Sequence, residues 1–231
     1  SWIPNKGKDA RNDQKVVVPL KNHFEKIILE ASAALVFDIQ KQKILYAKNE
    51  ETQLPIASLT KLMTALVAEE TLPENGVVAI GKDAIGEEGD SGFLVGERWP
   101  KKDLIRATLL ASSNDGARAL ATAVEAFEKA QATSSDAVFS FTDAMNARAE
   151  ALGMNQTYFL NPAGLDAQKN ESGAYGSARD IAALLEYILR NHPAILDATV
   201  DGERTFTSED GIAHVLKNTN EKTYAIPGLV A

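Results

Sequence analysis

Ser58-Leu59-Thr60-Lys61-Leu62-Met63-Thr64-Ala65-Leu66-Val67 is the stretch on which the interpretation of this chain rests. Counted from Leu59, its apolar side chains recur at i, i+3, i+4, i+7 and i+8. That is the spacing of a helix packed against a core. Pro55, just upstream, is typical of an extended approach to a helix. The pattern therefore predicts a helix that begins at or near Ser58.

Within this stretch, Ser58 and Lys61 place a hydroxyl and an amine about one helical turn apart. An unassisted serine is a weak nucleophile and needs a neighbouring base. Lysine is a base only when neutral, and lowering its pKa from about 10.4 to about 7 costs about 4 to 5 kcal/mol, which requires burial. The pair thus predicts a nucleophilic serine in a closed pocket. The same pattern also fits a helix N-cap followed by a solvated lysine.

A second polar group, Ala111-Ser112-Ser113-Asn114-Asp115-Gly116, separates two helical patterns. The first pattern carries Leu104, Ile105, Leu109 and Leu110, and the second carries Ala117, Leu120, Ala121, Val124 and Phe127. A break between two buried helices can present short polar side chains to a cleft. In the alternative interpretation, Asn114 or Asp115 merely caps the second helix.

These two motifs occur together in penicillin-binding proteins and class A β-lactamases, where Ser-x-x-Lys accompanies Ser-Asp-Asn and Lys-Thr-Gly. From about residue 31 to about residue 220, the chain resembles the low-molecular-mass penicillin-binding proteins, which are serine D-alanyl-D-alanine carboxypeptidases. Further stretches that carry this resemblance are Gly96-Glu97, Met145-Asn146, Leu152-Gly153-Met154, Thr157-Tyr158-Phe159, Asn161-Pro162-Ala163-Gly164-Leu165-Asp166 and Ser177-Ala178-Arg179-Asp180.

The resemblance implies a role for four residues. Ser58 would be the acylated nucleophile, Lys61 its general base and Ser112 a proton relay toward the leaving amine, and Asn114 would bind the amide carbonyl of the substrate. Such enzymes expel the terminal D-alanine of a peptidoglycan stem peptide through an acyl-enzyme, without a metal or organic cofactor. β-Lactams mimic this acyl donor. The resemblance also implies an extracytoplasmic location, in the periplasm or at the cell surface.

The predicted fold is α+β and β-lactamase/transpeptidase-like. Residues 33–37 with 44–47, and 203–207 with 212–217, predict antiparallel hairpins of one incomplete sheet. Helices are predicted between Ser58 and Arg190, including one capped by Ser135 and one that Ser177 and Asp180 begin and Pro193 ends. We expect a sheet-bearing lobe (1–57 and 196–231), a mainly helical lobe (58–195) and an active site at their seam.

The C-terminus departs from the family pattern. Lys217-Asn218-Thr219-Asn220 resembles a family stretch that precedes a strand bearing Lys-Thr-Gly, but no such triplet follows before Ala231. Lys222-Thr223-Tyr224 stands in the preceding loop and has Tyr in place of Gly. The resemblance assigns to that strand a cation for the substrate carboxylate and one oxyanion-hole donor, whose loss costs about 2.7 to 4 kcal/mol. We therefore expect this chain alone to be impaired.

Composition excludes several classes of function. A net charge of −8 and a pI near 5.0 argue against nucleic-acid binding. The absence of cysteine excludes disulfides and thiol catalysis, and no apolar run predicts a membrane span. His23, His192 and His214 are scattered, so a metal site is not predicted. Glu87, Glu88 and Asp90 are interpreted as a solvated loop.

Two alternatives remain. A class A β-lactamase shares Ser58 and Lys61 but needs a glutamate in Glu-x-x-Leu-Asn, and the corresponding stretch here is Thr157-Tyr158-Phe159-Leu160-Asn161. The other is a non-catalytic peptidoglycan-binding module. The residues do not distinguish a carboxypeptidase from an endopeptidase.

Overall fold

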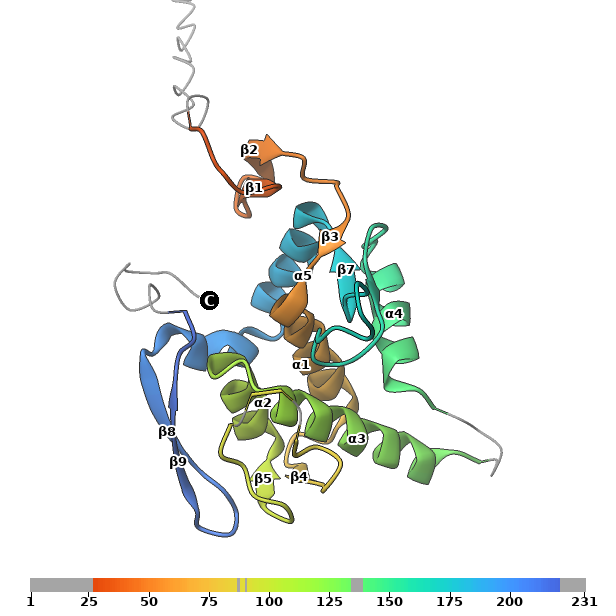
Figure 1. Cartoon of the computed structure of the whole chain (residues 1–231), viewed down its shortest axis with the longest axis vertical. Coiled ribbons are helices and arrows are strands. Elements are labelled where there is room, and N and C mark those ends of the chain that lie inside the picture. Colours follow the sequence, from red (N-terminus) through yellow and green to blue (C-terminus); the bar gives the residue numbers. More distant parts are fainter. Residues whose placement is uncertain (1–26, 87, 90, 134–138, 221–231) are drawn as a thin grey trace, which may run out of the picture. The chain divides into compact units, whose positions relative to one another are not determined.

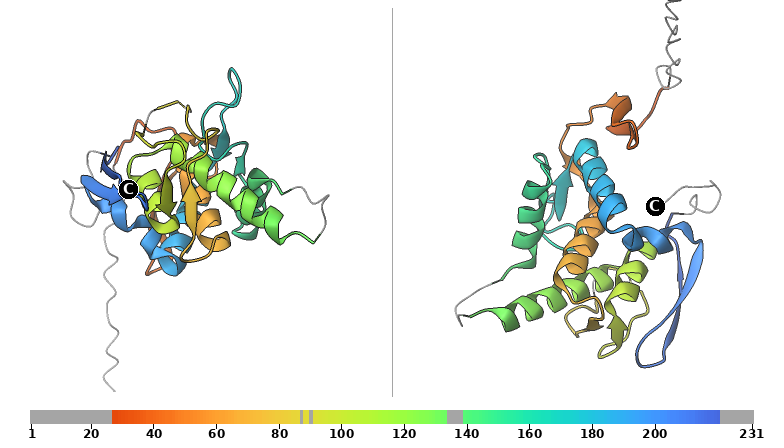
Figure 2. Two further views of the ribbon diagram at one scale, coloured as in Figure 1. Left: turned by 90° about the horizontal axis from the view of Figure 1, so that it is seen from below. Right: turned by 180° about the vertical axis from the view of Figure 1, so that it is seen from behind.

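In a computed structural model of the chain, helix α1 is the element around which the other helices pack. It spans Thr60–Thr71 and contacts α2 (Lys101–Leu110), α3 (Asn114–Gln131), α4 (Phe141–Ala151) and α5 (Ala178–Asn191). Figures 1 and 2 show α1 among these helices. All residues from Thr60 to Ala68 are buried, so this part of the helix is enclosed on every side.

This enclosure exceeds the single apolar stripe that the sequence predicted. Leu59, the first residue of that stripe, is 47% exposed and lies in a short 3-10 turn, Ala57–Leu59, ahead of α1. Thr64, Ala65 and Ala68 are completely buried. Small side chains at these positions let neighbouring helices approach closely, and a helix that is buried all round needs no polar face.

The structure describes residues 27–86, 88–89, 91–133 and 139–220. The chain divides after Glu30, and the elements named here all belong to the part from Ala31 onward. His23, Ser135 and the Lys222-Thr223-Tyr224 triplet lie outside the described residues, as do Glu87 and Asp90.

Both predicted hairpins are confirmed. The first pairs β1 (Ala34–Asp38) with β2 (Lys43–Lys48), with an irregular register between Val36 and Phe37. The second pairs β8 (Glu203–Thr207) with β9 (Ala213–Lys217). Each joins strands that are close in sequence, so turn chemistry and alternating apolar residues suffice to predict it.

The expectation of one sheet is corrected by the described residues, where the two hairpins belong to separate sheets. The expected helical part also contains short strands that pair over long sequence separations. The strands β4 (Val77–Ala79) and β5 (Arg98–Pro100) pair with each other, and β7 (Ala174–Gly176) pairs with both β3 (Leu54–Pro55) and β6 (Tyr158–Phe159). Strands of two or three residues are too short to show a period in the sequence.

Serine side chains cap the N-termini of three of the helices. Ser177 Oγ accepts from Asp180 N at 3.1 Å, which confirms the predicted start of α5, and Pro193 follows the end of that helix. Ser140, rather than Ser135, caps α4, because its Oγ accepts from Asp143 N at 3.3 Å. Ser113 caps α3. Each serine accepts a bond from one of the free N–H groups of a first helical turn.

The C-terminal end of α1 is held by a buried lysine from another helix. Lys101, the first residue of α2, is 3% exposed, and its Nζ donates to the carbonyls of Glu69 and Leu72, both at 3.2 Å. The same Nζ lies 2.9 Å from Glu69 Oε2. The last carbonyls of a helix have no partner within it and favour positive charge. Lys101 therefore joins α1 to α2.

We predict that Lys101→Ala lowers the free energy of unfolding by about 2 kcal/mol, because buried carbonyl groups lose their donor. Urea denaturation followed by circular dichroism measures this change. The neighbouring Lys102, which is exposed, provides the control, since Lys102→Ala should change stability by less than about 0.5 kcal/mol. Equal losses in both variants would contradict a specific role for Lys101.

Candidate active site

Ser58 lies in the turn that leads into α1 and is exposed. The residue before it, Ala57, has a φ of 44°, in the left-handed region that alanine rarely adopts. Such strain costs on the order of 1 kcal/mol or more and persists only where the surroundings impose it. The strained turn therefore places the Ser58 hydroxyl at the surface, just before the buried start of α1.

Lys61 points its amine at that hydroxyl. Lys61 Nζ lies 3.0 Å from Ser58 Oγ, and it donates to the carbonyl oxygen of Ala163 at 2.9 Å. The residue is only 1% exposed. Burial lowers the pKa of the Lys61 amine from 10.5 to about 8. The lysine is thus enclosed as the sequence predicted, although its pKa is lowered less far than to 7 and the serine itself is exposed.

The segment from Asn161 to Leu165 covers this lysine. Its carbonyls receive two donors from α1: Thr64 Oγ1 donates to Pro162 O at 2.7 Å, and Lys61 donates to Ala163 O. Gly164 has a φ of 79°, and a β-carbon there would lie 2.0 Å from the carbonyl oxygen of Ala57. Only glycine combines this conformation with so close an approach. The segment and the Ser58 turn therefore pack directly against each other.

In the second motif, two adjacent serines have different environments. Ser113 Oγ accepts from Gly116 N at 2.9 Å and from Ser91 Oγ at 2.6 Å, so it is the cap of α3. The alternative that Asn114 or Asp115 supplies this cap is therefore wrong. Ser112 has a φ of 52° and is half-buried. Among the described residues, no hydrogen bond joins its hydroxyl to Ser58 or Lys61.

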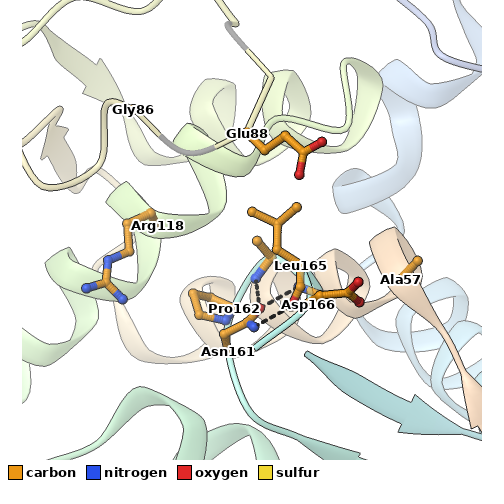
Figure 3. Close-up of a pocket in the computed structure, with 10 residues that line it drawn as sticks. Ala57, Gly86, Glu88, Arg118, Asn161, Pro162, Leu165 and Asp166 are labelled. Atoms are coloured by element: carbon orange, nitrogen blue, oxygen red, sulfur yellow. Dashed lines mark hydrogen bonds between the residues drawn. The ribbon is translucent and has the colours of Figure 1, made fainter. Parts of the chain in front are cut away.

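Asn114, the first residue of α3, contacts the loop that follows β4. Its Nδ2 donates to the carbonyl oxygen of Glu88. Glu88 is exposed, as predicted, and it also lines a cavity of about 600 Å³. Figure 3 shows this cavity with Arg118 of α3, Asp166 and Ala57 around it. The cavity reaches the residue next to Ser58, and its size suits a small ligand.

The remaining predicted residues lie in other environments. His214 is buried, and its Nε2 lies 2.6 Å from Glu97 Oε1; His192 Nε2 lies 3.4 Å from Glu70 Oε1. In the part of the chain that is described, no three His, Asp or Glu residues form a group that could hold a metal. Thr157 Oγ1, where a class A β-lactamase has its glutamate, donates to Asp180 Oδ2 at 2.8 Å.

Sequence reasoning did not find the residues that surround the pair. The resemblance to the family includes Asn161 and Ala163 but implies no role for them, and no motif implies a role for Thr64. The dipeptide Asn-Pro at 161–162 signals a turn. No local pattern indicates, however, that this turn contacts a lysine 102 positions earlier in the chain.

Comparison with known proteins gives a consistent result. A family model described as D-alanyl-D-alanine carboxypeptidase matches residues 21–228. The chain is 33% identical over 183 residues to the D-alanyl-D-alanine endopeptidase of Pseudomonas aeruginosa, covering 77% of this chain and 53% of the relative. It is 30% identical over 206 residues to the D-alanyl-D-alanine carboxypeptidase DacF of Bacillus subtilis, covering 87% and 49%.

A solved structure shows the same fold. The chain is similar to penicillin-binding protein D2 of Listeria monocytogenes in its cefotaxime-bound form, with a TM-score of 0.69 and 27% identity over 87% of this chain and 77% of the other. The chain spans about half the length of the curated relatives, 53% and 49% of them. The match to a fold of this kind confirms the prediction of a transpeptidase-like α+β architecture.

We predict that the Lys61 amine titrates near pH 8 in the folded protein. The measurement is an NMR titration of the lysine side-chain methylene signals, with Lys61→Met identifying the resonance by its loss. Because burial lowers the pKa, the amine should become neutral at a lower pH than a solvated lysine does. A midpoint above pH 10 would show that the amine is hydrated in solution.

Proposed function

This chain belongs to the D-alanyl-D-alanine carboxypeptidase family, and we propose that it carries the nucleophile and base of a serine DD-peptidase that acts on peptidoglycan stem peptides. β-Lactams would acylate the same serine. The observation that supports this proposal most directly is the 3.0 Å contact between Ser58 Oγ and the buried Lys61 Nζ. It joins an exposed hydroxyl to an amine whose pKa of about 8 leaves a usable neutral fraction near pH 7.

In the proposed reaction, neutral Lys61 takes the proton of the Ser58 hydroxyl as Oγ attacks the carbonyl carbon of the scissile D-alanyl-D-alanine bond. A C–O bond forms, the C–N bond breaks, and the proton passes through Ser112 to the departing amine. Water then hydrolyses the ester and restores the serine. Asn114 would donate to the amide carbonyl of the substrate, for which it has one N–H besides the one given to Glu88.

We assign the protein to an extracytoplasmic location because its proposed substrate is peptidoglycan. No helix among the described residues is long and apolar enough to cross a membrane. The two relatives have different names: that of Pseudomonas aeruginosa is an endopeptidase, and that of Bacillus subtilis is a carboxypeptidase. We propose the carboxypeptidase reaction, in accordance with the family description.

The decisive experiment is intact-mass spectrometry of the full-length gene product after incubation with a fluorescent penicillin. We predict a stable adduct on Ser58 that is absent from Ser58→Ala. Rapid turnover of the penicillin without an adduct would favour a class A β-lactamase. No adduct and no turnover would favour a non-catalytic module.

The acylation rate should increase about tenfold per pH unit below pH 8 and level off above it, because the neutral amine is the base. Lys61→Ala should slow acylation by about 10²–10⁴-fold.

Ser112 and Ser113 provide a matched test of the second motif. We predict that Ser112→Ala slows acylation by about 10²-fold, since it removes a proton relay, while the melting temperature is unchanged. Ser113→Ala should instead cost about 1 kcal/mol of stability, since it removes the cap of α3. Measuring both rate and melting temperature for each variant checks the assignment. Reversal of the two effects would show that Ser113, and not Ser112, serves the reaction.

A further inference from the structure

The side chain of Asn161 makes three hydrogen bonds to the backbone of its own segment. Its Oδ1 accepts from Gly164 N at 2.7 Å and from Ala163 N at 3.2 Å, and its Nδ2 donates to Leu165 O at 2.7 Å. Figure 3 shows these bonds converging on one side chain. Its backbone N–H donates to Gly173 O at 3.2 Å. One side chain thus holds the residues from 161 to 165 in a single turn.

This turn has a defined orientation toward α1. Pro162, Ala163 and Gly164 are buried, and the carbonyls of Pro162 and Ala163 accept from Thr64 and Lys61. These residues belong to no helix or strand. Without a ladder of backbone bonds to hold it, the Ala163 carbonyl depends on the side chain of Asn161 and on the Thr64 contact for its position.

The position of that carbonyl matters for the chemistry of the amine. A neutral lysine has two N–H donors and one lone pair, and the lone pair must face the Ser58 hydroxyl to take its proton. One N–H is donated to Ala163 O, in a different direction from Ser58. This bond restricts rotation of the amine. A catalytic base is commonly oriented by such a third group. After proton transfer, the same carbonyl accepts a bond from the ammonium ion, which has gained the proton that the serine lost.

We propose that Asn161 is a positioning residue, which builds the turn whose Ala163 carbonyl directs Lys61 toward Ser58. The inference rests on the proposed function of Ser58 and Lys61, but it concerns a residue whose hydrogen bonds, among the described residues, go to neither of them. Asn161 acts through the backbone of Ala163. Its loss therefore affects the rate of acylation more than the binding of the acyl donor.

A matched control is available in Asn146. Like Asn161 it is half-buried, and its side chain makes two bonds to backbone: Nδ2 donates to Phe159 O at 2.9 Å and Oδ1 accepts from Phe159 N at 2.8 Å. These bonds hold β6 rather than the turn. Asn161→Ala and Asn146→Ala therefore remove similar interactions, and only the first removes the support of the Ala163 carbonyl.

The experiment measures the rate of penicillin acylation against pH, the apparent dissociation constant and the melting temperature for the full-length gene product and both variants. We expect Asn161→Ala to slow acylation by about 100-fold at pH 7 with little change in the dissociation constant, since small misplacements of a reacting group have effects of this size. Its acid limb should move to higher pH, because water that enters the opened turn hydrates the amine. Asn146→Ala should melt earlier but acylate at the wild-type rate.

Equal acylation rates and equal pH profiles for Asn161→Ala and Asn146→Ala would overturn the inference. Should Asn161→Ala not fold, Asn161→Asp replaces it: it keeps the acceptor for Ala163 N and Gly164 N and loses the donor to Leu165, and we expect a rate between those of wild type and the alanine variant. A wild-type rate in Asn161→Asp together with an unchanged profile would also count against the inference.

A second measurement separates this inference from the proposed function. If wild-type protein is not acylated, the proposed function fails, and the NMR titration of Lys61 in wild type and Asn161→Ala then decides the inference alone. A higher pKa of Lys61 in Asn161→Ala, but not in Asn146→Ala, supports the positioning role. An unchanged pKa rejects it.

Discussion

The burial of the Lys61 amine between the Ser58 hydroxyl and the Ala163 carbonyl is the constraint on which this structure depends. A solvated lysine is protonated near neutral pH and cannot accept the proton of a serine. Packing α1 among the other helices and covering the amine with the segment from Asn161 to Leu165 removes water from it, and this burial lowers its pKa to about 8. The packing of the helices thus changes the chemistry of one side chain, and the strained turn before α1 keeps its partner, Ser58, accessible.

Two buried lysines near opposite ends of α1 differ in the partners that they meet. Lys101 is as enclosed as Lys61, but it lies 2.9 Å from the Glu69 carboxylate and donates to two carbonyls at the end of α1. An ion pair offsets the loss of water around a charge. Among the described residues, the partners of Lys61 are a hydroxyl and a carbonyl, both uncharged. The start of α1 therefore carries an amine suited to proton transfer, and its end carries one suited to structural support.

The neighbouring segments also have distinct structural roles. Ser113 stabilises the start of α3, which leaves the adjacent Ser112 outside the capping interaction and in a strained conformation. Asn114 attaches the loop at Glu88 to the same helix end. Across the cavity, the turn from Asn161 to Leu165 packs against Ala57 through Gly164, where a β-carbon would not fit. The cavity thus brings the Glu88 loop, Arg118 of α3 and the turn from Asn161 to Leu165 together beside Ala57.

The sequence alone determined features that depend on neighbouring residues. The proximity of Ser58 and Lys61, the hairpins near 34–48 and 203–217 and the start of α5 at Ser177 were predicted, because helix pitch, turn chemistry and capping are local. The family was predicted separately, from the resemblance of its motifs. Only the tertiary structure decided that most of α1 is enclosed on every side, that the sheets are separate and that Ser113 is the cap. It also decided that Ala163 accepts from a lysine 102 positions earlier. Such contacts depend on how distant segments pack, and no periodicity in the chain records which buried carbonyl an amine will meet.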